Sequence, residues 1–179
     1  MGQVASLFCL TQQDFQQLNA DPTAFDWSQP QLDGEAFCKT FEGLRFVLSK
    51  GRDAETIALI EQIFEPHLFV GEALDYETID WSQVSDAFPF DAQPTYYNPP
   101  EVVDAIAAFL ATVTHEAFRQ AFDPDELNHA EVYPGRVWNR ETAPDIGYNE
   151  RAMLAELQLL QNFFARIQQR GNYCVCFIG

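Results

Sequence analysis

The six residues Tyr173-Cys174-Val175-Cys176-Phe177-Ile178 constrain the fold of this 179-residue chain more than any other segment. All six are apolar or aromatic, so a strand formed by them would carry apolar side chains on both of its faces. Strands of this kind are typically covered on both sides. Residues 3–10, which include Val4, Leu7 and Phe8, predict another strand near the opposite end of the sequence.

Apolar residues at helical spacing fill much of the sequence between these two strands. They predict a long helix over residues 149–170, opened by Asn149, and another over residues 37–48. A further helix is predicted to begin at Asn98, with Pro99 in its first position. Strands do not alternate strictly with helices, which favours the α+β class. We therefore expect one domain over residues 1–179, rich in helix, with a small mixed sheet that contains the N- and C-terminal strands.

The formal net charge of −17 is concentrated in one part of the chain. Residues 53–118 contain thirteen acidic residues and no Lys or Arg. Such a field repels nucleic acid and anionic membranes and attracts a basic protein or a cation. The sequence has no apolar run of about 18 residues that could span a membrane, and it lacks the features of a signal peptide. We therefore expect a cytoplasmic protein that binds neither nucleic acid nor membrane.

Aromatic side chains interleave with the acids after Gly71, and this pattern has two interpretations. The rings could cover the core beneath a long loop, or they could anchor a docking surface for a basic protein, because interfaces are enriched in aromatic residues. The candidate partner-binding residues are Asp75, Glu77, Asp80, Trp81, Asp86, Tyr96 and Tyr97.

A second candidate region follows the predicted turn Tyr133-Pro134-Gly135, where we expect Gly135 to have a positive φ. Arg136, Trp138 and Arg140 form a basic and aromatic group that is rare in this acidic chain. Together with Tyr133 they could form the rim of a pocket. Alternatively, they clamp nearby acidic residues, and we favour the clamp because isolated arginines among many carboxylates usually find structural partners.

Catalytic and cofactor motifs are missing from the sequence. It contains no Walker loop, G-x-G-x-x-G or G-x-S-x-G segment, and its three histidines lie in separate segments. Cys174 and Cys176 would share one face of a strand, and Cys9 would join them if the terminal strands were neighbours. That cluster would be a soft-metal or redox candidate, but we favour buried, reduced thiols. We predict no catalytic residue, no metal site and no cofactor.

Several segments, in order along nearly the whole chain, resemble the YfbM-like family of uncharacterised bacterial proteins. They are Met1-Gly2 before a strand, residues 41–51, Tyr97-Asn98-Pro99-Pro100-Glu101-Val102, Phe122-Asp123-Pro124, Glu131-Val132-Tyr133-Pro134-Gly135 and residues 170–179. The resemblance implies a small cytoplasmic α+β domain and transfers no catalytic residues. The chain departs from the family by an inserted helix over residues 53–64, predicted to be capped by Asp53.

These observations favour a non-enzymatic binding protein, such as an immunity or inhibitor protein that masks a basic partner. The alternative is a small-molecule-binding domain, or an enzyme of unidentified reaction. The sequence does not indicate an oligomeric state.

Overall fold

Seven helices and five strands form within the residues that the structure describes, which are 2–28, 32–71, 94–141, 143 and 145–179 of a computed structural model. The strands are β1 (Val4–Leu10), β2 (Asp33–Cys38), β3 (Leu68–Val70), β4 (Thr95–Asn98) and β5 (Tyr173–Ile178). The helices are α1 (Gln12–Ala20), α2 (Phe41–Ser49), α3 (Ala54–Glu61), α4 (Pro100–Thr112), α5 (His115–Ala121), α6 (Pro124–His129) and α7 (Glu150–Gln168).

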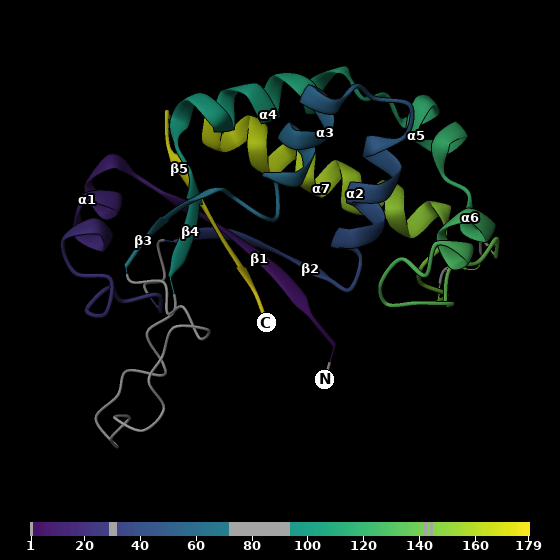
Figure 1. Cartoon of the computed structure of the whole chain (residues 1–179), viewed down its shortest axis with the longest axis horizontal. Helices are drawn as coiled ribbons and strands as arrows, with labels where there is room; N and C mark the ends of the chain where they lie inside the picture. The colour runs from purple at the N-terminus through teal and green to yellow at the C-terminus, as the bar shows by residue number, and fades with distance from the viewer. Residues whose placement is uncertain (1, 29–31, 72–93, 142, 144) are drawn as a thin grey trace.

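The five strands form one sheet in the order β2-β1-β5-β4-β3, so the first and last strands of the chain are neighbours at its centre. This confirms the α+β class and the placement of both terminal strands in the sheet. The expectation of a mixed sheet was wrong, because all four neighbouring pairs are antiparallel. β1 and β5 run in opposite directions, and the two termini consequently lie near one another at one end of the sheet (Figure 1).

The sheet is covered on both faces, as the apolar sequence of β5 predicts. Helices α2, α3, α4 and α7 pack over one face (Figure 1), and their core includes Cys174 and Cys176 of β5. A smaller core on the opposite face contains Val175 of β5 and Leu18 of α1. Alternate residues of β5 therefore belong to different cores, which is the period of two expected for a strand.

Side chains cap helices α1, α3 and α7, and the caps predicted at Asp53 and Asn149 are confirmed. Thr11 caps α1 with a reciprocal capping box to Asp14, Asp53 accepts a hydrogen bond from the N–H of Thr56 at α3, and Asn149 caps α7. Each cap satisfies a backbone N–H that has no partner within its own helix.

Two predicted helix starts were wrong, because each lies in a short strand. Phe37 belongs to β2, and α2 begins at Phe41. Asn98 is the last residue of β4, and the N-cap of α4 is Pro99. The amide of Asn98 instead donates to the carbonyl oxygen of Gln62 at 2.6 Å, so it joins β4 to the end of α3.

None of the helices within the described residues has the length and apolar character that would be needed to cross a membrane.

Candidate functional site

The β3–β4 end of the sheet exposes three large apolar side chains, which we call the β3–β4 patch: Leu68, Phe69 and Tyr96. They are 48%, 46% and 41% exposed, respectively. Phe69 and Tyr96 are directly opposite one another in the ladder, and their ring centroids lie 5.7 Å apart. Most apolar side chains of this size are buried in a folded domain, and exposed ones that cluster together are typical of interaction surfaces.

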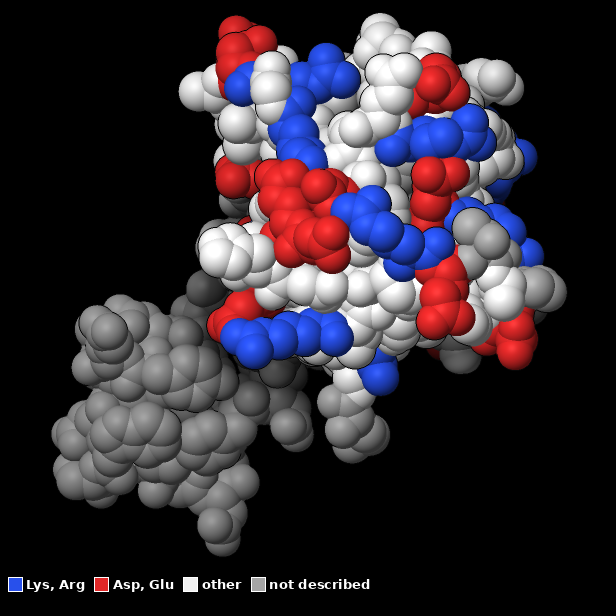
Figure 2. Space-filling view, turned by 90° about the vertical axis from the view of Figure 1, so that its right-hand side faces the viewer, with Lys and Arg blue, Asp and Glu red and all other residues white. Residues whose placement is uncertain are grey.

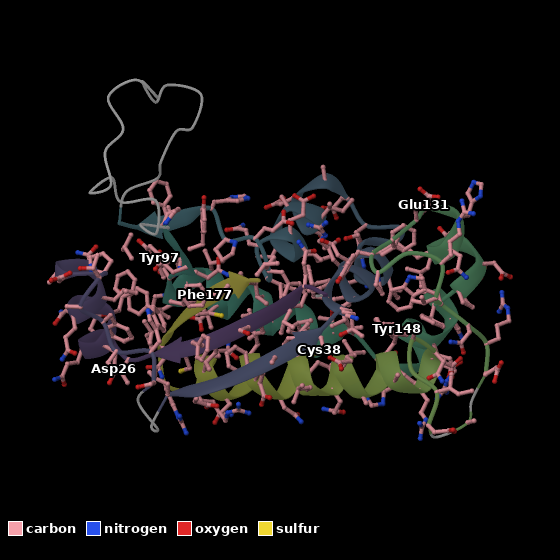
Figure 3. The ribbon with its side chains drawn as sticks, turned by 90° about the horizontal axis from the view of Figure 1, so that it is seen from below. Asp26, Cys38, Tyr97, Glu131, Tyr148 and Phe177 are labelled. Carbon is pink, nitrogen blue, oxygen red and sulfur yellow. The ribbon has the colours of Figure 1, made fainter. Side chains whose placement is uncertain are left out.

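The two candidate tyrosines of β4 have different environments. Tyr97 points to the opposite face of the sheet from Tyr96 and packs in the smaller core, where its ring centroid lies 4.5 Å from that of Phe15. The ring of Tyr173 stacks on Phe15 at 3.9 Å (Figure 3 shows the Tyr97 end of the sheet). Thus Tyr97 covers the core and Tyr96 faces solvent. The other candidates, Asp75, Glu77, Asp80, Trp81 and Asp86, lie outside the described residues.

Trp138 lies in the core under α2 and is 3% exposed. Its indole Nε1 donates to the carbonyl oxygen of Val132 at 3.0 Å. The amide of Asn128 also holds it, since Asn128 Nδ2 donates to the Trp138 carbonyl oxygen at 2.7 Å and Oδ1 accepts from its N–H at 3.1 Å. Tyr148 packs edge-on against the indole. These contacts make Trp138 an anchor for the segment that follows α6.

Arg136 and Arg140 each contact acidic residues at the surface. Arg140 Nη2 lies 2.9 Å from Asp123 and 2.8 Å from Asp125, and Arg136 lies 2.7 Å from Glu131. The pKa of Arg140 is raised, first by its hydrogen bond to Asp125. Figure 2, which views the α5–α6 end, shows acidic and basic side chains lying next to one another across this face.

The turn after Tyr133 has the predicted backbone conformation. Gly135 has a φ of +101°, which confirms the expectation of a positive φ. Its N–H donates to the carbonyl oxygen of Val132 at 2.9 Å. The hydroxyl of Tyr133 accepts from the N–H of Gln3 at 2.7 Å, which ties this turn to the start of β1.

An open hollow of about 800 Å³ lies between α2 and the residues after α6. Tyr133 lines it, but Arg136, Trp138 and Arg140 are not among its described lining residues. Its charged lining residues are Glu42, Arg45, Lys50, Glu61, Glu126 and Glu131. Both cations are already in ion pairs, Arg45 with Glu42 and Lys50 with Glu126. The hollow is therefore separate from the Trp138 group and presents more carboxylates than cations.

A family model described as "Domain of unknown function (DUF1877)" matches residues 1–177. The chain belongs to the DUF1877 family. The predicted resemblance to YfbM-like proteins is thereby confirmed, and the family assigns no activity.

One solved structure extends this relationship to the fold of the whole DUF1877 domain. It is the crystal structure of YfbM from Escherichia coli, described as a protein of unknown function, with a TM-score of 0.59. The two chains are 14% identical, and the match covers 98% of this chain and 99% of that one. At that identity the likeness shows a shared fold alone. None of the curated proteins matches this sequence.

The cysteines of this DUF1877 domain lie as the strand order requires. Cys9 is directly opposite Cys174, and Cys176 follows on the same face, so three thiols are buried near one another. Burial raises the pKa of Cys9 and Cys174, and it raises that of Cys176 to about 12. Within the described part of the chain, no group of three or more His, Cys, Asp or Glu side chains is placed to hold a metal ion.

We expect a thiol reagent at pH 8 to label one cysteine per folded chain rapidly and all four after unfolding, because only Cys38 is exposed among the four. The other thiols are shielded, and their raised pKa values leave little reactive thiolate. Timed labelling with mass spectrometry would measure this. Cys38→Ser is the matched control and should remove the rapid phase; rapid labelling of Cys174 in the folded protein would contradict the prediction.

Sequence reasoning missed Leu68 and Phe69 as candidate surface residues. Three consecutive apolar residues are consistent with a short buried strand, so the sequence of this segment alone does not indicate exposure. Only the position of β3 at the end of the strand order leaves these side chains uncovered. The available signal was the run of three apolar residues inside a stretch that contains no Lys or Arg.

Proposed function

We propose that this chain is a non-enzymatic binding protein whose partner is a basic protein. An immunity or inhibitor protein that masks a basic toxin or a nucleic-acid-binding enzyme would act in this way. The observation that carries the proposal is the exposed β3–β4 patch in a chain with a net charge of −17.

The patch and the charge have complementary roles in such a complex. Exposed aromatic side chains such as Phe69 and Tyr96 supply the apolar area that anchors an interface. The acidic field attracts a basic partner, speeds association and disfavours acidic competitors. The acidic field alone would also attract a small cation, and the apolar patch alone would not distinguish a basic protein from an acidic one. Together they favour a basic protein.

The distribution of cations also supports a binding role for the β3–β4 end. The α5–α6 end contains basic side chains that pair with neighbouring acids, such as Arg119 with Glu150 and Arg140 with Asp123. By contrast, β3, β4 and the sequence on either side of them lie in the 53–118 run without Lys or Arg. Among the described acids of that run, only Glu65 and Glu116 form ion pairs, with Arg45 and Arg119 respectively, so most of the charge of its described part is not offset by a paired cation.

The proposal predicts that binding depends on salt and on the acidic segment. A partner captured from a lysate of the native host and then purified should bind more weakly as salt increases, mainly through slower association. Neutralising Asp75, Glu77, Asp80 and Asp86 together to their amides should weaken binding further. The fold should remain intact or become slightly more stable, because self-repulsion decreases. Surface plasmon resonance and thermal unfolding would measure the two effects.

The matched control neutralises four exposed acids outside the run: Asp26, Glu131, Glu141 and Asp145. It removes the same formal charge, so any difference between the two variants reports the location of the acids and not the total. Equal binding by both variants and the parent chain, together with salt-independent association, would remove the acidic segment from the mechanism.

A second candidate function, small-molecule binding, rests on the hollow beside α2. Its volume of about 800 Å³ lies in the range of ligand pockets. Its open shape and four glutamates favour a cationic compound over an anionic one. Thermal-shift measurements with a panel of organic cations would test it, and Tyr133→Ala should reduce any stabilisation that the hollow provides.

A further inference from the structure

The two edge strands of the sheet differ in how they are protected. β2 forms one edge and carries Asp33 and Glu35, both of which contact Arg166 of α7. Charged side chains of this kind discourage an edge strand from pairing with another chain. β3 forms the other edge, and its three residues, Leu68, Phe69 and Val70, are all apolar. The β3 edge therefore lacks the charged protection that β2 has.

Among the described residues, only β4 forms backbone hydrogen bonds with β3. In an antiparallel ladder, the N–H and C=O groups of alternate residues point away from the neighbouring strand. Leu68–Val70 pairs with β4 on one side. Beyond that ladder, no backbone hydrogen bond joins β3 to any other described residue. An added strand would satisfy these outward groups.

The exposed side chains at this edge lie on both faces of the sheet. Phe69 and Tyr96 share one face, which is also the face of Cys176, the residue opposite Tyr96 in β5. Leu68 lies on the other face, since side chains alternate along a strand. A partner that docked against one face would cover only part of the β3–β4 patch. A strand added beside β3 would contribute side chains to both faces and cover all of it.

Charge decides what kind of strand fits this edge. A second copy of the chain would bring another net charge of −17 to the interface, and the two copies would repel each other. A segment that carries Lys or Arg would instead be attracted by the acids of the 53–118 run. Apolar residues between those cations would pack on Phe69 and Tyr96 on one face, and the aliphatic stems of the Lys or Arg side chains would lie along Leu68 on the other.

We propose that β3 binds an extended basic segment of the partner as an added antiparallel or parallel strand of the sheet. Recognition of this type takes affinity from main-chain hydrogen bonds and specificity from alternate side chains. Since β3 has only three residues, the apolar patch supplies much of the interaction. This inference rests on the proposed function, because it assumes a basic protein partner and specifies how that partner binds.

A defined peptide tests the binding mode directly. The probe is an end-blocked octapeptide of alternating lysine and valine, and its control has the same sequence with alternate backbone nitrogens methylated. The full ¹⁵N-labelled chain should bind the first peptide, with slower amide hydrogen exchange in β3, and should bind the methylated peptide at least fivefold more weakly. Phe69→Ala should weaken binding of the first peptide by about fivefold or more, as expected for an interface anchor.

The matched control variant is Val137→Ala, which shortens an exposed apolar residue away from the edge and should leave peptide affinity unchanged. Equal binding of both peptides without protection of β3 would overturn strand addition while leaving a basic partner as the proposed function. Failure of the unmethylated peptide to bind at millimolar concentration would also overturn it. Strand addition would also be overturned if the edge were already paired in the free protein. Slow hydrogen exchange at the outward β3 amides of the free chain, or a stable dimer paired through β3, would show this.

Discussion

Trp138→Ala is expected to lower the free energy of unfolding by about 3–5 kcal/mol, the usual cost of removing a large aromatic side chain from a core. The indole is almost completely buried and belongs to the core under α2. Its loss would leave a cavity and would also remove the hydrogen bond from Nε1 to Val132. That carbonyl oxygen still accepts from the N–H of Gly135, which limits the additional cost. Denaturant titration followed by circular dichroism would measure the change.

Arg136→Ala provides the control for this variant. The Arg136 side chain is 78% exposed and pairs with Glu131 at the surface, where ion pairs contribute about 0–1 kcal/mol. Its removal should therefore barely change stability. A folded Trp138→Ala protein of unchanged stability that had lost partner or ligand binding would contradict the structural role and favour the pocket interpretation.

The different environments of Trp138 and the two arginines change the clamp interpretation, in which all three residues were expected to hold nearby acidic residues. The basic and aromatic group was treated as a unit, but the structure divides it. Trp138 anchors the segment from the inside, whereas Arg136 and Arg140 contact acids at the surface. Sequence proximity brought these residues to attention, but it did not indicate which of them point inward.

Much of the fold could be predicted because its determinants are local. The apolar runs of β1 and β5, the spacing along α7 and the caps at Thr11, Asp53 and Asn149 each involve residues a few positions apart. Their interactions form within one element, so the sequence of that element contains the signal. The family resemblance gave the same fold class independently.

Strands β2 and β4, which the sequence analysis did not predict, depend on residues far away in the sequence. β2 includes Asp33, Gly34 and Glu35, residue types that are depleted in strands. It is held by pairing with β1 and by Arg166, whose Nε and Nη2 atoms lie 2.7 and 2.8 Å from the two carboxylate oxygens of Asp33. The same guanidinium holds the pKa of Asp33 below its usual range. An arginine 133 positions away gives no local signal at β2.

The candidate surface was only partly predictable for a similar reason. Tyr96 and Tyr97 are neighbours in sequence, but strand alternation places them on opposite faces. Which of the two is covered depends on where α1 packs and on where the sheet ends. Neither fact is encoded within residues 95–98. The acidic and aromatic composition therefore indicated the right part of the chain, and the strand order identified the exposed residues.

Gly43→Ala is expected to destabilise the protein by about 1–3 kcal/mol, the range for inserting an extra carbon into a packed core. Gly43 is buried in the first turn of α2, directly against the indole of Trp138. A Cβ there would overlap Cη2 of the indole and would lie 2.8 and 3.0 Å from Cζ2 and Cζ3. In an exposed helix, replacing Gly with Ala gains about 1 kcal/mol, so the expected effect has the opposite sign from helix propensity.

A double-mutant cycle with Trp138→Leu separates the two effects. If the indole is the obstacle, Gly43→Ala should destabilise the parent chain and should be neutral or stabilising in the Trp138→Leu background, where the overlapping ring atoms are absent. The coupling free energy from denaturant titrations of the four proteins measures the contact. An equal cost of Gly43→Ala in both backgrounds would contradict it, since the loss would then arise from the helix itself and not from the close approach of α2 to Trp138.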